Sequence, residues 1–250
     1  MSANLPEVRI LPNAAAALPL LLDEVRALLR QPTPLLGFAT GGTFTAFLQA
    51  LAVELQQGRI AADALRATHL DEYLGFAPDR AGGMVHELGT NCPALLAMLA
   101  RGTFFPVPHD GTPASLRAHD ERLQRAGGVQ LQLLGIGRNG HLAFNEPGTP
   151  FDRGFHVTTL AATTREDARA RFAPQEPPTQ AVTSGIATIL QARRLVLCAF
   201  GAAKAPAVRA MLRGGIDPAC PASVVRRHGS ALVLLDREAA RELDGSVAAG

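Results

Sequence analysis

The stretch LLGFATGGTFTAFLQALAVELQQ, residues 35–57, contains the alternation on which the predicted fold rests. It begins with an apolar run at 35–39, passes through two glycines, and continues as a segment whose apolar residues recur at helical spacing. A short buried strand followed by a tight turn and a helix is the repeating unit of a parallel sheet. We therefore expect residues 35–57 to form one strand-turn-helix unit.

The same alternation recurs along the chain. Further segments with helical spacing occupy residues 113–128 and 204–215, and Glu121 and Arg125 can form an ion pair one turn apart. This order predicts a single-domain, three-layer α/β/α fold over residues 1–250, Rossmann-like, with a mostly parallel sheet and helices on both faces. The apolar runs expected as strands are 35–39, 67–70, 103–107, 129–134, 156–160, 195–200 and 231–235.

Composition narrows the class of protein. Of the 250 residues, 47% are hydrophobic and 18% are charged, as in a soluble globular protein. The formal net charge of +2 is spread along the chain, so no nucleic-acid partner is expected. The N-terminus lacks a signal pattern and the apolar stretch at 14–22 is too short to span a bilayer, so we expect a cytoplasmic protein with no membrane partner. The three cysteines are widely spaced, which disfavours a disulfide framework or a zinc site.

Residues suited to anion binding follow two of the predicted strands. In parallel α/β sheets the ligand crevice lies beyond the carboxyl ends of the strands. The segment Thr40-Gly41-Gly42-Thr43 opens a helix at such an end, so its amides and hydroxyls suit a phosphate, with an ordinary capped turn as the alternative. Lys204 stands in the first turn of a later helix, where an anionic ligand would explain a cation; a solvated lysine is the alternative.

The stretch THLDEYLGF, residues 68–76, places two acids at the end of another strand. Neighbouring residues of an extended chain point to opposite sides, so we expect only one of Asp71 and Glu72 to enter the crevice. The alternative is a pair of solvated acids at a strand end.

The stretch GIGRNGHLAFNEP, residues 135–147, contains glycines spaced as in a dinucleotide loop. A dinucleotide site needs a helix directly after the glycines, whereas turn-forming residues follow here. His141 can carry protons near neutral pH, and Glu146 could orient it if the loop folds back. Neither paired histidines for a metal nor a nucleophilic serine elbow accompanies them.

Seven motifs connect these stretches to a known family. They are TGGT, LDEYLGF, LGIGRNGHLAFNEPGTPFD, TTLAATTRED, TSGIATIL, FGAAKA and CPASVVRRH. In order and spacing they resemble the glucosamine-6-phosphate deaminase (isomerase) family, whose superfamily includes the 6-phosphogluconolactonases. The likeness runs from about residue 35 to residue 237, and the Phe-Asn-Glu-Pro continuation separates it from the lactonase relatives.

The resemblance implies a reaction and a role for each matching residue. The pyranose ring of glucosamine 6-phosphate opens, a proton moves between C2 and C1, and ammonia leaves to give fructose 6-phosphate. Asp71 would move the C2 proton and His141 would open the ring, with Glu146 and Asn139 holding and polarising it. The resemblance implies a sugar phosphate as partner and no metal or organic cofactor, and it leaves a homo-oligomer open. The phosphate would be held by Thr40, Gly41, Gly42, Thr43, Arg171 and Lys204.

Two site positions depart from the family pattern. Asn139 stands where some members have Asp; it cannot stabilise an imidazolium by charge, but it can fix the ring tautomer by a hydrogen bond. The family's phosphate-binding arginine aligns with Ala170, which Arg169 and Arg171 flank. We prefer Arg171 because the family's arginine is followed by Phe, as Arg171 is.

A third departure lies in the segment after LDEYLGF. The family's usual P-x-S-Y lid is replaced there by DRAGGMVHELGTN, residues 79–91. This leaves two alternatives within the superfamily, a sugar-phosphate lactonase and an isomerase of altered specificity. A non-catalytic sugar-phosphate sensor is a further alternative, but the presence of Asp71, His141 and Glu146 together favours an enzyme.

Overall fold

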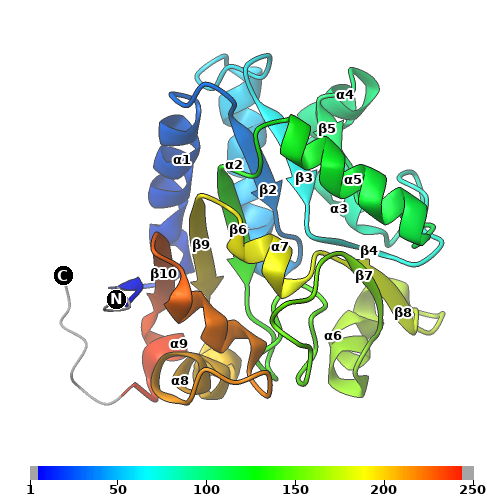
Figure 1. Ribbon diagram of the computed structural model, residues 1–250. Coiled ribbons are helices and arrows are strands. Elements are labelled where there is room, and N and C mark those ends of the chain that lie inside the picture. The colour runs from blue at the N-terminus through cyan, green and yellow to red at the C-terminus, as the bar shows by residue number, and fades with distance from the viewer. Residues whose placement is uncertain (1–4, 244–250) are drawn as a thin grey trace.

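A seven-stranded sheet forms the centre of the structure, a computed structural model that describes residues 5–243 (Figure 1). Every pair of neighbouring strands in it runs parallel, which confirms the predicted α/β class. In spatial order the strands are β1 (Glu7–Leu11), β10 (Ala231–Asp236), β9 (Arg194–Ala199), β6 (Leu131–Gly135), β2 (Leu35–Phe38), β3 (Arg66–His69) and β5 (Phe104–Phe105).

A small antiparallel sheet and the helices complete the described part of the chain. The small sheet has the order β4 (Asp71–Tyr73), β8 (Gln180–Thr183) and β7 (His156–Thr159). The α-helices are α1 (Ala17–Leu28), α2 (Gly42–Gln56), α3 (Met84–Asn91), α4 (Ala94–Ala100), α5 (Pro113–Arg125), α6 (Ala162–Phe172), α7 (Ile186–Leu190), α8 (Ala205–Arg213) and α9 (Arg237–Ala240). The 3₁₀ helices are η1 (Ala14–Ala16), η2 (Ala202–Lys204) and η3 (Pro221–Arg227).

Helices cover both faces of the large sheet. Leu35 and Leu36 are consecutive on β2, so their side chains point to opposite faces. Leu36 belongs to the main hydrophobic core with residues of α1 and α2, whereas Leu35 packs in a separate cluster with Leu123 of α5. Figure 1 accordingly shows α2 and α5 on opposite sides of the sheet. Because both faces are covered, the inner strands β2, β9 and β10 are mainly runs of buried apolar residues without polar alternation.

Four strands differ from the sequence expectation. No strand was expected at β1 or β8, and Asp71 was expected to lead into a loop, whereas it begins β4 and pairs with Thr183. The run at 156–160 does form a strand, β7, but it pairs antiparallel with β8 outside the parallel sheet. Its residues are only half-buried because it lies at the edge of the small sheet. Its apolar pattern therefore could not show whether the strand belongs to the large sheet or to the small one.

The order of the large sheet reverses between β2 and β6. From β2 the chain continues outward to β3 and β5, whereas from β6 it continues the other way to β9 and β10. The loops that leave two such neighbouring strands diverge to opposite sides and open a crevice at the carboxyl edge. The loops at 40–43 and 136–141 both leave the sheet at this point.

Two further observations concern membranes and thiols. Among residues 5–243, every helix is too short or too polar to span a bilayer. Cys92, Cys198 and Cys220 are free thiols, and the first two are buried.

Candidate active site

A cavity of about 480 Å³ lies where the chain leaves the carboxyl ends of β2, β3, β6 and β9. This volume is typical of small-molecule sites. Asn139 and Glu146 do not line it but contact groups that do. The other residues expected at the site all line it: Thr40, Gly41, Gly42, Thr43, Asp71, His141, Arg171 and Lys204.

The loop after β6 holds the ring of His141 against its own backbone. A Cβ atom at Gly137 would lie 2.3 Å from the imidazole, so only glycine fits there. Gly140, with a φ of 85°, closes the turn, and the chain then reverses at Ala143, whose φ of 50° is in the left-handed region. The reversal returns Glu146 to His141, and no helix follows the glycines, so the dinucleotide alternative is excluded.

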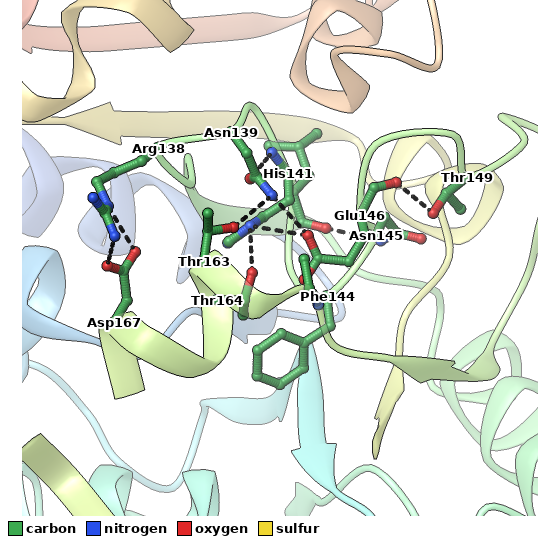
Figure 2. Close-up of polar contacts among 12 residues, drawn as sticks. Arg138, Asn139, His141, Phe144, Asn145, Glu146, Thr149, Thr163, Thr164 and Asp167 are labelled. Carbon is green, nitrogen blue, oxygen red and sulfur yellow. Dashed lines mark hydrogen bonds and ion pairs between the residues drawn. The ribbon is translucent and has the colours of Figure 1, made fainter. Parts of the chain in front are cut away.

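Contacts around the imidazole join the loop to α6 (Figure 2). Nδ1 of His141 lies 3.6 Å from Oε2 of Glu146 and 3.4 Å from Oγ1 of Thr164. Asn139 donates from Nδ2 to Oε2 of Glu146 over 2.9 Å, and its Oδ1 accepts from the main-chain N–H of His141 over 3.2 Å. The expectation that Asn139 bonds to the ring is therefore wrong, because Nδ1 faces Glu146 and Thr164 instead. Asn139 acts on the ring through Glu146.

Glu146 is ionised in this environment. Burial alone would raise its pKa, but the polar groups of His141 and Thr164 and the N–H of Ala161 outweigh burial and lower the pKa to about 2. The Ala161 N–H donates to Oε1 over 3.1 Å. A carboxylate beside Nδ1 favours a proton on that nitrogen, which leaves Nε2 of His141 free to accept or return a proton.

The side chains of Asp71 and Glu72 lie in different places although the two residues are neighbours on β4. Asp71 lines the cavity, and burial together with the charge of Glu72 raises its pKa to about 8, against the opposing charge of Arg171. Glu72 points away and accepts from the N–H groups of Met84 over 2.9 Å and Val85 over 3.0 Å. One carboxylate thus enters the cavity, as expected, while the other fixes the start of α3.

The phosphate-binding candidates line the cavity from the start of α2, from α6 and from η2. Gly41 precedes α2 with a φ of 87°, which glycine adopts without strain, and the first amides of a helix have no partner within it. Lys204 ends η2 directly before α8. Burial lowers the pKa of Lys204, while Asp167 raises it and Arg138 lowers it. A helix N-terminus and a partly desolvated lysine suit an anion.

Arg171 and Arg169 point to different sides of α6. Positions two apart on an α-helix differ by about 200° around its axis. Arg171 lines the cavity, and its Nη2 lies 2.5 Å from Oε2 of Glu87. Arg169 is exposed and lies 3.8 Å from Glu176. The geometry favours Arg171 as the arginine for the phosphate, in agreement with the sequence argument.

Several site residues had no role assigned from the sequence. Thr164 and Asp167 lie in the TTLAATTRED motif, and Asp167 forms a two-atom ion pair with Arg138 that ties the loop to α6 (Figure 2). Met84 and Glu87 lie in the segment that departs from the family pattern. The sequence pointed to these four residues only in that they lie in those two segments. Their contacts could not be predicted, because their partners come from distant parts of the chain. Among the described residues, no group of three or more His, Cys, Asp or Glu could hold a metal ion.

Comparisons with known proteins agree on one family. The family model described as glucosamine-6-phosphate isomerases/6-phosphogluconolactonase matches residues 13–234. Glucosamine-6-phosphate deaminase of Hahella chejuensis is 39% identical over 221 residues, which cover 88% of this chain and 85% of that protein. The deaminase of Streptomyces avermitilis is 39% identical over 245 residues, covering 95% and 92% respectively.

Solved structures show the same fold. A monomeric glucosamine-6-phosphate deaminase superposes with a TM-score of 0.83 at 32% identity, covering 94% of this chain and 99% of that one. The 6-phosphogluconolactonase from Trypanosoma cruzi superposes with a TM-score of 0.75 at 20% identity, covering 98% of each chain, which is a likeness of fold alone.

Gly137→Ala tests the packing of the imidazole. The added Cβ would push the His141 ring from its place, and a displacement of about 1 Å at a reacting group can lower turnover roughly 10²-fold. We expect such a loss of kcat in a protein that still folds by circular dichroism. Gly215→Ala is the control, because a Cβ there meets nothing. Full turnover by Gly137→Ala would show that the ring position is not critical.

Asp71→Asn tests the cost of the buried carboxylate. Folding raises the pKa of Asp71 from 3.8 to about 8, so the folded protein is destabilised progressively as pH rises between these values. Asn does not ionise, so the variant should have a higher Tm than the parent at pH 9, and the difference should shrink toward pH 4. The exposed Asp63→Asn serves as control. An equal or lower Tm at pH 9 would contradict the buried charge.

Proposed function

The chain belongs to the glucosamine-6-phosphate isomerase/6-phosphogluconolactonase family, and from this premise we propose that it is a glucosamine-6-phosphate deaminase. The enzyme converts glucosamine 6-phosphate and water into fructose 6-phosphate and ammonia in amino-sugar catabolism. The roles are assigned from one observation. The imidazole of His141, which lies beside the carboxylate of Glu146, lines the same cavity as the high-pKa carboxylate of Asp71.

Ring opening is the step assigned to His141. The C1–O5 bond breaks as the proton of the anomeric hydroxyl is removed and the ring oxygen is protonated, which leaves an aldehyde at C1. The Nε2 atom can take part in both transfers because Glu146 and Thr164 hold the other ring nitrogen. Asn139 is a positioning residue that fixes Glu146 and the main chain of His141.

Transfer of the C2 proton is the step assigned to Asp71. The C1 carbonyl makes the proton on C2 acidic, and a carboxylate whose pKa is about 8 is a stronger base than an ordinary one. Removal of this proton gives an enolamine across C1 and C2. Return of the proton at C1 gives an imine at C2, which water hydrolyses to the ketone and ammonia.

Binding of the phosphate is assigned to a second group of residues that line the cavity. Amides and hydroxyls of Thr40 to Thr43 at the start of α2 would donate hydrogen bonds to its oxygens, and Arg171 and Lys204 would balance its charge. A phosphate fixed there holds the C1–C2 end of the sugar toward His141 and Asp71. Binding energy from this remote group would thus serve orientation at the reacting atoms.

Three features of the protein stay predictions. They are its location in the cytoplasm, the organisation of residues 1–250 as one domain, and any association into a homo-oligomer.

The assay that tests the function mixes the protein with glucosamine 6-phosphate and measures fructose 6-phosphate and ammonia in equal amounts. Asp71→Asn should lower kcat by about 10²–10⁴-fold, because general acid–base catalysis contributes factors of that size, while Asp63→Asn should retain activity. Absence of both products would discard the deaminase, and hydrolysis of 6-phosphogluconolactone in its place would establish the lactonase. Full activity of Asp71→Asn would discard the assigned base.

The pH profile tests the state of Asp71 in the free enzyme. The base must be ionised, so kcat/KM should rise with pH, with a midpoint near the Asp71 pKa of about 8 rather than near that of an ordinary carboxyl. The substrate amine titrates in a similar range, so its ionisation is measured separately by NMR and divided out. A midpoint near pH 4 would mean that the base is not a buried carboxyl.

A further inference from the structure

The carboxylate of Glu87 occupies the side of the cavity assigned to phosphate. Its Oε1 accepts a hydrogen bond from the N–H of Gly41 over 2.7 Å, and its Oε2 lies 2.5 Å from Nη2 of Arg171. The second contact is an ion pair without the geometry of a hydrogen bond, so Oε2 has no hydrogen-bond donor. The side chain of Glu87 is only 16% exposed. An internal anion therefore already bridges a backbone amide and a guanidinium at this position.

Contacts at the start of α3 hold Glu87 in this place. Glu87 lies one turn into α3, whose first two amides are held by the carboxylate of Glu72. Met84, on the same face of the helix, accepts from Thr40 Oγ1 over 3.0 Å and contacts Nη1 of Arg171 over 3.4 Å through its sulfur. The start of α3 thus contacts Arg171, one partner of the carboxylate, and Thr40, the residue before the other partner. This segment is the one in which the sequence departs from the family pattern.

A bound phosphate and the carboxylate would compete for the same groups. The N–H of Gly41 has one proton to donate, and it is engaged by Glu87. Arg171 has its charge balanced by the same side chain. A phosphate oxygen entering this space would also meet a like charge at close range, which is unfavourable in a partly buried site.

We infer that Glu87 is a specificity-determining residue that covers the phosphate position, so that the phosphate group of the substrate binds only by displacing its carboxylate. The inference rests on the proposed function for the identity of the substrate. Glu87 then reduces the population of binding-competent protein, and the apparent Kd rises by the inverse of that population. A strongly charged phosphate can displace the carboxylate from Arg171 where a weak anion cannot.

The direct test measures binding of inorganic phosphate at pH 8 by isothermal titration calorimetry. Glu87→Gln keeps the size and the acceptor for Gly41 but removes the charge, and Glu87→Ala removes the group. If the carboxylate covers the site about nine-tenths of the time, phosphate should bind both variants about tenfold more tightly than the parent. Glu121→Gln, an exposed charge on α5, should bind phosphate like the parent. Unchanged or weaker binding by both variants would overturn the inference, because it would mean that Glu87 only holds Arg171 in position.

Kinetics and folding controls make the test decisive. KM for glucosamine 6-phosphate should fall in Glu87→Gln so that kcat/KM rises, whereas a residue that merely positions Arg171 would raise KM when removed. Circular dichroism and Tm establish that each variant folds. Should Glu87→Gln and Glu87→Ala both fail to fold, Glu87→Asp, one methylene too short to span both partners, should also bind phosphate more tightly.

Tighter phosphate binding without deaminase activity would overturn the proposed function and leave the inference standing. Normal deaminase activity with unaltered phosphate binding would overturn the inference alone.

Discussion

The direct pairing of β2 with β6 is the constraint on which the site depends. Leu36 faces Leu131 and Gly37 faces Gln132 in parallel register, although the paired residues are 95 positions apart in the sequence. A Cβ at Gly37 would lie 2.0 Å from the Gln132 side chain, whose Nε2 instead donates to the Gly37 carbonyl over 3.1 Å. Because the strands run in the same direction and their continuations diverge, the phosphate loop and the loop of His141 open side by side.

The fold places three buried carboxylates near that crevice in different environments. Asp71 has desolvation and a like charge beside it, so its pKa rises to about 8. Glu146 is equally removed from water, but donors from His141, Thr164 and Ala161 hold its pKa near 2. Glu72 receives backbone N–H groups and serves α3. Environments that push the pKa values of neighbouring acids apart separate a base from an orienting charge.

The sequence was sufficient wherever the chemistry follows from neighbours along the chain. Alternation on a strand separated Asp71 from Glu72, and the short spacing from His141 to Glu146 allowed the two to meet if the loop folded back. The roles of Thr164 and Glu87 could not be predicted, because they depend on where α6 and α3 pack against loops far away in sequence. The bond of Asn139 was misassigned because the sequence does not show in which direction a loop side chain points. The small antiparallel sheet escaped notice because β4 and β8 are short and β7 is only half-buried, so none has a clear apolar pattern.

The site divides its work between strand ends and helices. The proton-transfer groups lie where strands end: Asp71 in β4 directly after β3, and His141 in the loop after β6. Such positions hold the small tolerances that proton transfer requires. The acids that pair with the cavity's cations belong instead to helices, Glu87 to α3 and Asp167 to α6. Ion pairs tolerate an exchange of partners. A substrate phosphate can therefore replace Glu87 at Arg171 while His141 and Asp71 keep their positions.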